Sequence, residues 1–165
     1  MMAAPALAGD SAGGAIAVLT AARLASASIP VSAVLLICPN TDLTLSLPSV
    51  RAEGSGWGLQ ADDMGWLVHQ WAPDLSPQML VRYSPLHADL RGLRTTLVAT
   101  AEHDPLRDEG AALVDHLRYL DVDAHHLPHP GLVHGFITLD TVSPAAKNAG
   151  DVLMSQLGRL LARRG

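Results

Sequence analysis

Three short apolar runs recur along the chain, at residues 4–8, 31–37 and 96–101, each bounded by polar or turn-forming residues. Apolar runs of about four to eight residues predict buried strands. Residues 124–127 predict a last strand that is partly exposed, because two histidines lie at its centre. After the first run the spacing changes, because residues 12–27 form a small and apolar segment without proline, in which Ile16, Leu19 and Leu24 recur at helix spacing. Strands that alternate with helices predict an α/β fold with a parallel sheet and right-handed helical crossovers.

The remaining segments divide into two kinds. Residues 40–89 are rich in Pro, Gly and Ser and hold a short predicted helix at 62–71, with Met64, Leu67, Val68 and Trp71 on one side. Residues 108–120 and the C-terminal segment predict amphipathic helices. We therefore expect one domain over residues 1–165, in which 40–89 is an excursion from the sheet. Whether that excursion lines a pocket or only forms its own surface cluster stays open from the pattern alone.

The first strand runs into a turn of small residues with a serine at its apex. The turn reads Gly9-Asp10-Ser11-Ala12-Gly13, a G-x-S-x-G pattern that exposes a nucleophilic serine between a strand and a helix. Such a sharp turn brings backbone close to backbone, which favours glycine on both sides. We expect the Ala12 N–H to face an incoming carbonyl oxygen and Asp10 to brace the turn. The alternative interpretation is an ordinary glycine-rich turn that caps a helix.

A serine nucleophile needs a base and an acid, and both follow in the sequence. Asp104 comes directly after the strand at 96–101, where parallel sheets place functional groups. His134 follows a loop at 128–133, behind the last strand. Two other carboxylates compete with Asp104. Asp108 is expected to begin the next helix, where it stabilises the N-terminus, and Glu102 to lie on or just beyond the strand.

Several histidines lie close together near the last strand and suggest a metal site as an alternative. They are His125, His126, His129 and His134. Adjacent residues of a strand point to opposite faces, and no cysteine or carboxylate completes a ligand spacing. The sequence therefore predicts no metal and no other cofactor.

Composition narrows the class of protein further. The chain has 165 residues, is 48% hydrophobic and 16% charged, and carries a net charge of −5. That length allows a sizeable core, and the negative charge argues against nucleic acid and anionic membranes as partners. The single cysteine, Cys38, excludes an internal disulfide and is expected to be a small core residue. No apolar run of about twenty residues predicts a membrane span, and no signal peptide is recognised, so a cytoplasmic location is expected.

The combined motifs resemble the bacterial hormone-sensitive-lipase-like family of carboxylesterases. The resemblance rests on segments in the family's order: 9–14, 83–86, 102–110 and 134–136. It implies an α/β-hydrolase fold in which Ser11 is the nucleophile, Asp104 the acid and His134 the general base. The Ala12 N–H would be one oxyanion donor. The implied activity is hydrolysis of small carboxylic esters through an acyl-serine, and 40–89 would hold part of the cap and the acyl pocket.

The sequence also departs from that family. Members are roughly twice as long and carry an upstream His-Gly-Gly-Gly oxyanion loop, whereas this sequence contains no such motif. We therefore expect a partial α/β-hydrolase fold without the N-terminal strands and the oxyanion loop, and weak turnover. We also expect association through an unpaired edge of the sheet, including homo-oligomers. The alternatives are an inactive fragment that acts through a partner and a small-molecule-binding pseudo-hydrolase.

Overall fold

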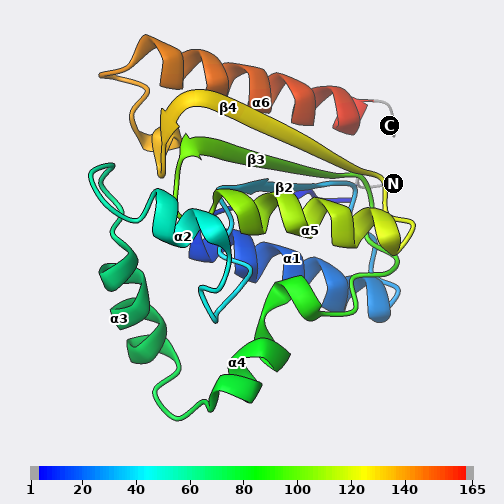
Figure 1. Cartoon of the computed structure of the whole chain (residues 1–165). Helices are drawn as coiled ribbons and strands as arrows, with labels where there is room; N and C mark the ends of the chain where they lie inside the picture. Colours follow the sequence, from blue (N-terminus) through cyan, green and yellow to red (C-terminus); the bar gives the residue numbers. More distant parts are fainter. Residues whose placement is uncertain (1–3, 163–165) are drawn as a thin grey trace.

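A computed structural model describes residues 4–162 of the chain, and within them the strands form one four-stranded sheet (Figure 1). The strands lie in the order of the chain, and every neighbouring pair is parallel. Their bounds are β1 (Leu7–Asp10), β2 (Val34–Ile37), β3 (Thr96–His103) and β4 (Ala124–Val133). The predicted α/β class with four parallel strands is confirmed. Because the strands are parallel, their carboxyl ends lie at one edge of the sheet.

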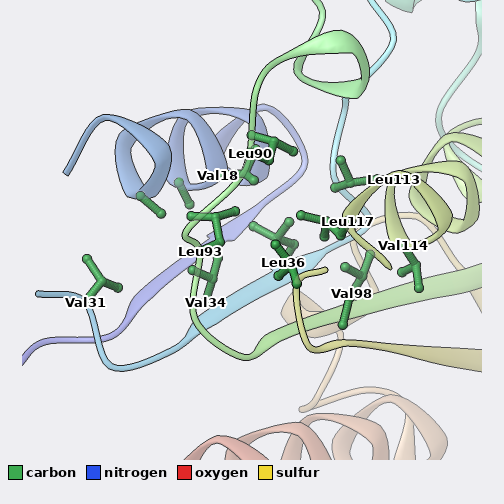
Figure 2. Packing of buried hydrophobic residues seen from close by; sticks show 14 residues of the cluster. Val18, Val31, Val34, Leu36, Leu90, Leu93, Val98, Leu113, Val114 and Leu117 are labelled. Carbon is green, nitrogen blue, oxygen red and sulfur yellow. The ribbon is translucent and has the colours of Figure 1, made fainter. Parts of the chain in front are cut away.

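Helices cover both faces of this sheet. The helices α1 (Ala12–Ser26) and α5 (Arg107–Tyr119) pack on one face, and α6 (Pro144–Ala162) packs on the other (Figure 1). Alternation along β2 divides the core accordingly, because Leu36 belongs to the α1–α5 side and Leu35 to the α6 side. Figure 2 shows Leu36 and Val98 of the sheet beside Leu117 of α5.

The buried face of α1 differs from the expected one. Its buried residues are Gly14, Ala17, Val18 and Ala21. The predicted helix at 12–27 is confirmed, but Ile16 is 63% exposed and Leu19 is 37% exposed, so these two apolar residues do not face the core. Small residues allow α1 to approach the sheet closely, while Ile16 and Leu19 lie at the wall of a pocket described below.

The observed bounds of the strands also differ from the predicted bounds, because pairing with the neighbouring strands determines where each strand begins and ends. β1 begins at Leu7 and continues to Asp10, because these residues pair with Val34–Ile37. The ladder of β2 begins at Val34, where its partner β3 begins at Thr96. β4 extends to Val133, so the prediction of a loop at 128–133 was wrong and the whole segment is strand. Pro128 and Pro130 are tolerated because β4 is an edge strand, where a residue without an N–H breaks no ladder.

The segment between β2 and β3 contains short helices. They are α2 (Pro48–Ala52), α3 (Ala61–Trp71), α4 (Pro77–Tyr83) and the 3₁₀ turn η1 (Pro85–His87). A second 3₁₀ turn, η2 (Phe136–Thr138), follows β4. The predicted helix at 62–71 is confirmed to within one residue. Among the described residues, α3 and α4 project beyond the layer formed by α1 and α5 (Figure 1).

β1 lies at one edge of the sheet, with β2 as its neighbour on one side. An edge strand presents backbone N–H and C=O groups with which another chain can pair. The expected association through this edge stays a prediction.

Candidate active site

Ser11 occupies a strained turn between β1 and α1. Its φ is 55° and its ψ is −123°, a conformation that non-glycine residues seldom adopt and that clusters at functional sites. The Ser11 N–H donates to the Ile37 carbonyl at 2.9 Å, and the Ser11 carbonyl accepts from the Gly14 N–H at 2.9 Å. These bonds hold the serine between the end of the sheet and the first turn of the helix.

The glycines around Ser11 differ in how much space a side chain would have. A Cβ on Gly9 would lie 2.0 Å from the Gly13 carbonyl oxygen, so no side chain fits there. A Cβ on Gly13 would meet nothing within 4 Å, whereas one on Gly14 would lie 2.7 Å from Pro39 Cβ. Crowding therefore requires glycine at 9 and 14. Gly13 contributes its backbone to the close contact, and the expected crowding of a Gly13 side chain was wrong.

Three residues distant in the sequence meet at the carboxyl ends of the strands. His134 Nε2 lies 3.1 Å from Ser11 Oγ, and His134 Nδ1 lies 2.9 Å from Asp104 Oδ2. Ser11 follows β1, Asp104 follows β3 and His134 follows β4, so the parallel sheet itself brings them together. An ionised carboxylate only accepts hydrogen bonds, hence Nδ1 carries the proton and donates to Asp104. Nε2 is then free to accept from the Ser11 hydroxyl.

Asp104 is fixed in place by burial and by its own turn. The residue is 0% exposed. Its second oxygen, Oδ1, accepts the Leu106 N–H at 2.8 Å. This bond orients the carboxylate toward His134 and leaves Oδ2 for the imidazole.

The two competing carboxylates lie elsewhere. Glu102 Oε2 accepts the Gly131 N–H at 2.8 Å. Asp108 Oδ2 accepts the Ser49 N–H at 2.9 Å and so joins α5 to α2. Among the described residues, Asp104 is the carboxylate that pairs with His134, at 2.9 Å, so the geometry favours it as the partner of the imidazole.

The other histidines near β4 each have a different neighbour. His125 pairs with Asp123 at 3.0 Å, and His126 Nε2 lies 2.9 Å from Thr100 Oγ1. The His129 ring lies against Phe136, with ring centroids 5.1 Å apart. Burial lowers the pKa of His126 and of His129. The four histidines thus do not converge on one point among the described residues.

The remaining predicted residues flank Ser11. Ala12 is the first residue of α1, and the first N–H groups of a helix have no acceptor within the helix. Its N–H is thus available to a ligand. Asp10 has one buried oxygen, Oδ1, without a partner among the described residues. Burial raises the pKa of Asp10, although His134 and, to a smaller extent, the Ser11 backbone N–H counteract part of that rise.

Cys38 lies in the core, as expected, but also beside the site. Its sulfur, an Asp104 oxygen and a His134 nitrogen lie within 4.8 Å of one another. Burial, followed by the Asp104 charge, raises the pKa of the thiol far above its usual value. A metal ligand must be the thiolate, so this donor set is a poor match for a metal ion.

An apolar pocket opens beside Ser11. Its volume is about 330 Å³. The residues that line it come from α1, from 40–89 and from the turn after β3: Ser11, Ala12, Ala15, Ile16, Leu19, Asn40, Leu43, Leu59, Met64, Leu67, Val68, Trp71, Tyr83, Pro85 and Leu106. The predicted apolar side of α3 faces this pocket through all four of its members. The pocket thus offers an apolar surface to a ligand that reaches Ser11.

Sequence interpretation missed Glu109, a carboxylate buried in the first turn of α5. It is 1% exposed, and its Oε2 accepts the backbone N–H groups of Thr41 and Asp42. An acidic residue at a helix N-terminus is ordinarily a solvated dipole partner. No local signal in the sequence could show this contact, because its partners lie 67 and 68 positions away.

The raised pKa of Glu109 predicts how the free energy of unfolding depends on pH. Burial raises its pKa from 4.5 to about 8, although the Asp42 and Thr41 N–H groups counteract part of the rise. Between these values the folded chain binds more protons than the unfolded chain, so the free energy of unfolding falls as pH rises. The stabilising contribution is complete below pH 4.5 and is lost as pH passes about 8. His126 and His129 have lowered pKa values, so they make the free energy of unfolding rise with pH. They do so only below pH 6.5, the ordinary pKa of these side chains.

We therefore expect the Tm of the wild-type chain to fall from pH 6.5 to pH 8. Glu109→Gln, which cannot ionise, should flatten that slope. Differential scanning calorimetry at several pH values measures both. A wild-type Tm that is constant or rises over this range, or an unchanged slope in Glu109→Gln, would contradict the assignment.

Comparisons with known proteins identify the family of the chain. A family model described as the alpha/beta hydrolase fold matches residues 2–138. Carboxylesterase NlhH of Mycobacterium tuberculosis is 36% identical over 162 residues, covering 94% of this chain and 50% of the relative. The ethyl acetate hydrolase of Pseudomonas putida is 33% identical over 140 residues, covering 83% and 44%. The chain thus spans about half the length of these curated relatives.

A solved structure supports the same fold family. An esterase described as from the bacterial hormone-sensitive lipase family superposes with a TM-score of 0.85 at 25% identity, covering 96% of this chain and 52% of the other. Across the described part of the chain, no helix combines the length and apolar character needed to cross a bilayer.

Proposed function

The chain belongs to the alpha/beta hydrolase fold family, and from this premise we propose that it forms the catalytic part of a serine carboxylesterase. In this proposal Ser11 is the nucleophile, His134 the general base and Asp104 the acid that orients His134. The observation that carries it is the position of His134, whose two ring nitrogens lie 3.1 Å from Ser11 Oγ and 2.9 Å from Asp104 Oδ2. The resemblance to hormone-sensitive-lipase-like carboxylesterases and the names of the relatives support the same class.

The proposed reaction begins with acylation. Ser11 Oγ attacks the ester carbonyl carbon while His134 Nε2 takes the hydroxyl proton, so that a tetrahedral oxyanion and an imidazolium form together. Asp104 stabilises the imidazolium through its bond to Nδ1. The C–O bond to the alcohol then breaks, and Nε2 returns the proton to the leaving alkoxide. The products are a free alcohol and an acyl-Ser11.

Deacylation repeats these steps with water as the nucleophile. His134 Nε2 takes a proton from water, the hydroxide adds to the acyl carbon, and the Ser11 Oγ–acyl bond breaks as Oγ regains the proton. The Ala12 N–H would stabilise the oxyanion in both halves of the reaction, since it begins α1 where the helix dipole is positive. No metal or other cofactor is required by these steps.

The pocket suggests which esters are suitable. Apart from Ser11, Asn40 and the Tyr83 hydroxyl, its wall consists of apolar side chains and small residues. We assign residues 40–89 to this wall, since Asn40, Leu43, Met64, Tyr83 and their neighbours contribute most of its lining. The substrate class that we propose is a small, uncharged carboxylic ester with a short acyl chain.

A second hypothesis is a binding or partner-dependent module without turnover. It is favoured by the oxyanion site, because within residues 1–165 the Ala12 N–H is the one donor that we assign to it. It is disfavoured by the completeness of the Ser11, His134 and Asp104 arrangement. A cytoplasmic location and association through the edge at β1 stay sequence-based predictions.

Ester hydrolysis by the polypeptide 1–165 tests the proposal. We expect slow release of p-nitrophenol from p-nitrophenyl acetate and butyrate, abolished in Ser11→Ala. Loss of a single oxyanion donor lowers turnover by about 10²- to 10³-fold, and activated esters need that stabilisation least. Unactivated ethyl esters should therefore be hydrolysed far more slowly. Equal rates on both classes of ester would contradict our account of the oxyanion site, and turnover that survives in Ser11→Ala would contradict the proposed function.

A further inference from the structure

The loop after β2 supports the Ser11 turn directly. The Asn40 N–H donates to the Ser11 carbonyl at 3.1 Å. One residue earlier, Pro39 lies against the first turn of α1, where a Cβ on Gly14 would come within 2.7 Å of Pro39 Cβ. Any displacement of this loop therefore moves the backbone on which Ser11 is held.

Glu109 binds the continuation of that loop. The carboxylate accepts the N–H groups of the next two residues, Thr41 and Asp42, and the Thr41 hydroxyl donates to the Glu109 carbonyl at 3.3 Å. All three residues are buried, with exposures of 1%, 0% and 2%. Water cannot replace these bonds, so removal of the carboxylate leaves two buried N–H groups without an acceptor.

The segment that contains Glu109 also contains Asp104, the proposed acid. Asp104 lies five positions earlier, and the turn between them is closed by the Arg107 N–H, which donates to the Asp104 carbonyl at 3.0 Å. The Gly110 N–H donates to the Leu106 carbonyl at 3.2 Å. One short segment thus fixes Asp104 beside His134 and, through Glu109, fixes the loop that supports Ser11.

We propose that Glu109 is a positioning residue, which holds Ser11 in its strained conformation and at hydrogen-bonding distance from His134 through the chain Glu109, Thr41–Asp42, Asn40 and Ser11. The inference rests on the proposed role of Ser11 as nucleophile. It assigns to Glu109 no contact with substrate. What matters is an oxygen that accepts the two N–H groups, which a neutral carboxyl and a glutamine amide both offer.

Three variants test this inference through the rate at which a fluorophosphonate labels Ser11, measured per folded molecule at pH 7. Glu109→Leu keeps the size but removes the acceptor, and we expect it to label at least about tenfold more slowly, since small misplacements in a site have large kinetic effects. Glu109→Gln should stay within about threefold of wild type, because it keeps the acceptor. Leu117→Ala is the matched control, because it destabilises the same helix from within the core and should leave the rate unchanged.

A second measurement is independent of reactivity. The exchange rate of the Asn40 amide, which reports its bond to the Ser11 carbonyl, should rise in Glu109→Leu and stay near the wild-type value in Glu109→Gln. If Glu109→Leu labels at the wild-type rate and keeps the Asn40 amide protected, the inference is overturned. Equal losses in Glu109→Gln and Glu109→Leu overturn it as well. If the wild-type chain itself is not labelled, the proposed function fails, and the Asn40 amide alone decides the inference.

Discussion

Replacing His134 by alanine is expected to lower kcat for p-nitrophenyl butyrate by about 10⁴- to 10⁶-fold, with a folded chain retained. The imidazole is partly exposed, and its two hydrogen-bond partners are Ser11 and Asp104. Its loss removes the base. Steady-state kinetics and a thermal melt of the same preparation measure both effects.

Asp104→Asn should lower kcat by about 10⁴-fold, because an amide can donate to Nδ1 and so favour the wrong tautomer of His134. His125→Ala serves as the control, since His125 is an exposed histidine of β4 that contacts Asp123. The double variant of Ser11→Ala and His134→Ala should lower kcat no further than either change alone, because the two residues act as one unit. Losses that simply multiply would show that the two residues act separately.

The glycines around Ser11 provide the second large effect, on stability. A Cβ at position 9 would lie 2.0 Å from the Gly13 carbonyl oxygen, which is backbone and cannot rotate away. We expect Gly9→Ala to lower the free energy of unfolding by about 3 kcal/mol or more, or to prevent folding, because β1 and α1 must separate.

Gly13→Ala is the matched control within the same turn. Its Cβ would meet nothing within 4 Å, and Gly13 lies within α1. Alanine in place of glycine in a helix is expected to stabilise by about 0.5–1 kcal/mol. Urea unfolding measures both variants, and we expect the free energy of unfolding to fall in Gly9→Ala and to rise in Gly13→Ala. Similar destabilisation by both would contradict the close contact between Gly9 and the Gly13 backbone.

What could be predicted from the sequence was local or followed from the parallel sheet. The meeting of Ser11, Asp104 and His134 could be predicted because the Ser11 turn is continuous in the chain and because Asp104 and His134 each follow a strand. Once strands are parallel, their carboxyl ends meet, so no knowledge of distances was needed.

What could not be predicted depended on partners distant in the sequence. The bond of Glu109 to the loop after β2 joins residues 67 and 68 positions apart. The buried face of α1 was set by close approach to the sheet, which favours Gly14 and Ala17 over the larger Ile16. β4 continues past the predicted end because it pairs with β3 as far as Val133, and its edge position tolerates Pro128 and Pro130.

The proposed nucleophile is tested most directly by treating the chain with a fluorophosphonate and mapping the modified peptide by mass spectrometry. The account predicts one phosphonylated residue, Ser11, with labelling lost in Ser11→Ala and in His134→Ala. A label on a different residue, or labelling that persists in Ser11→Ala, would contradict the account.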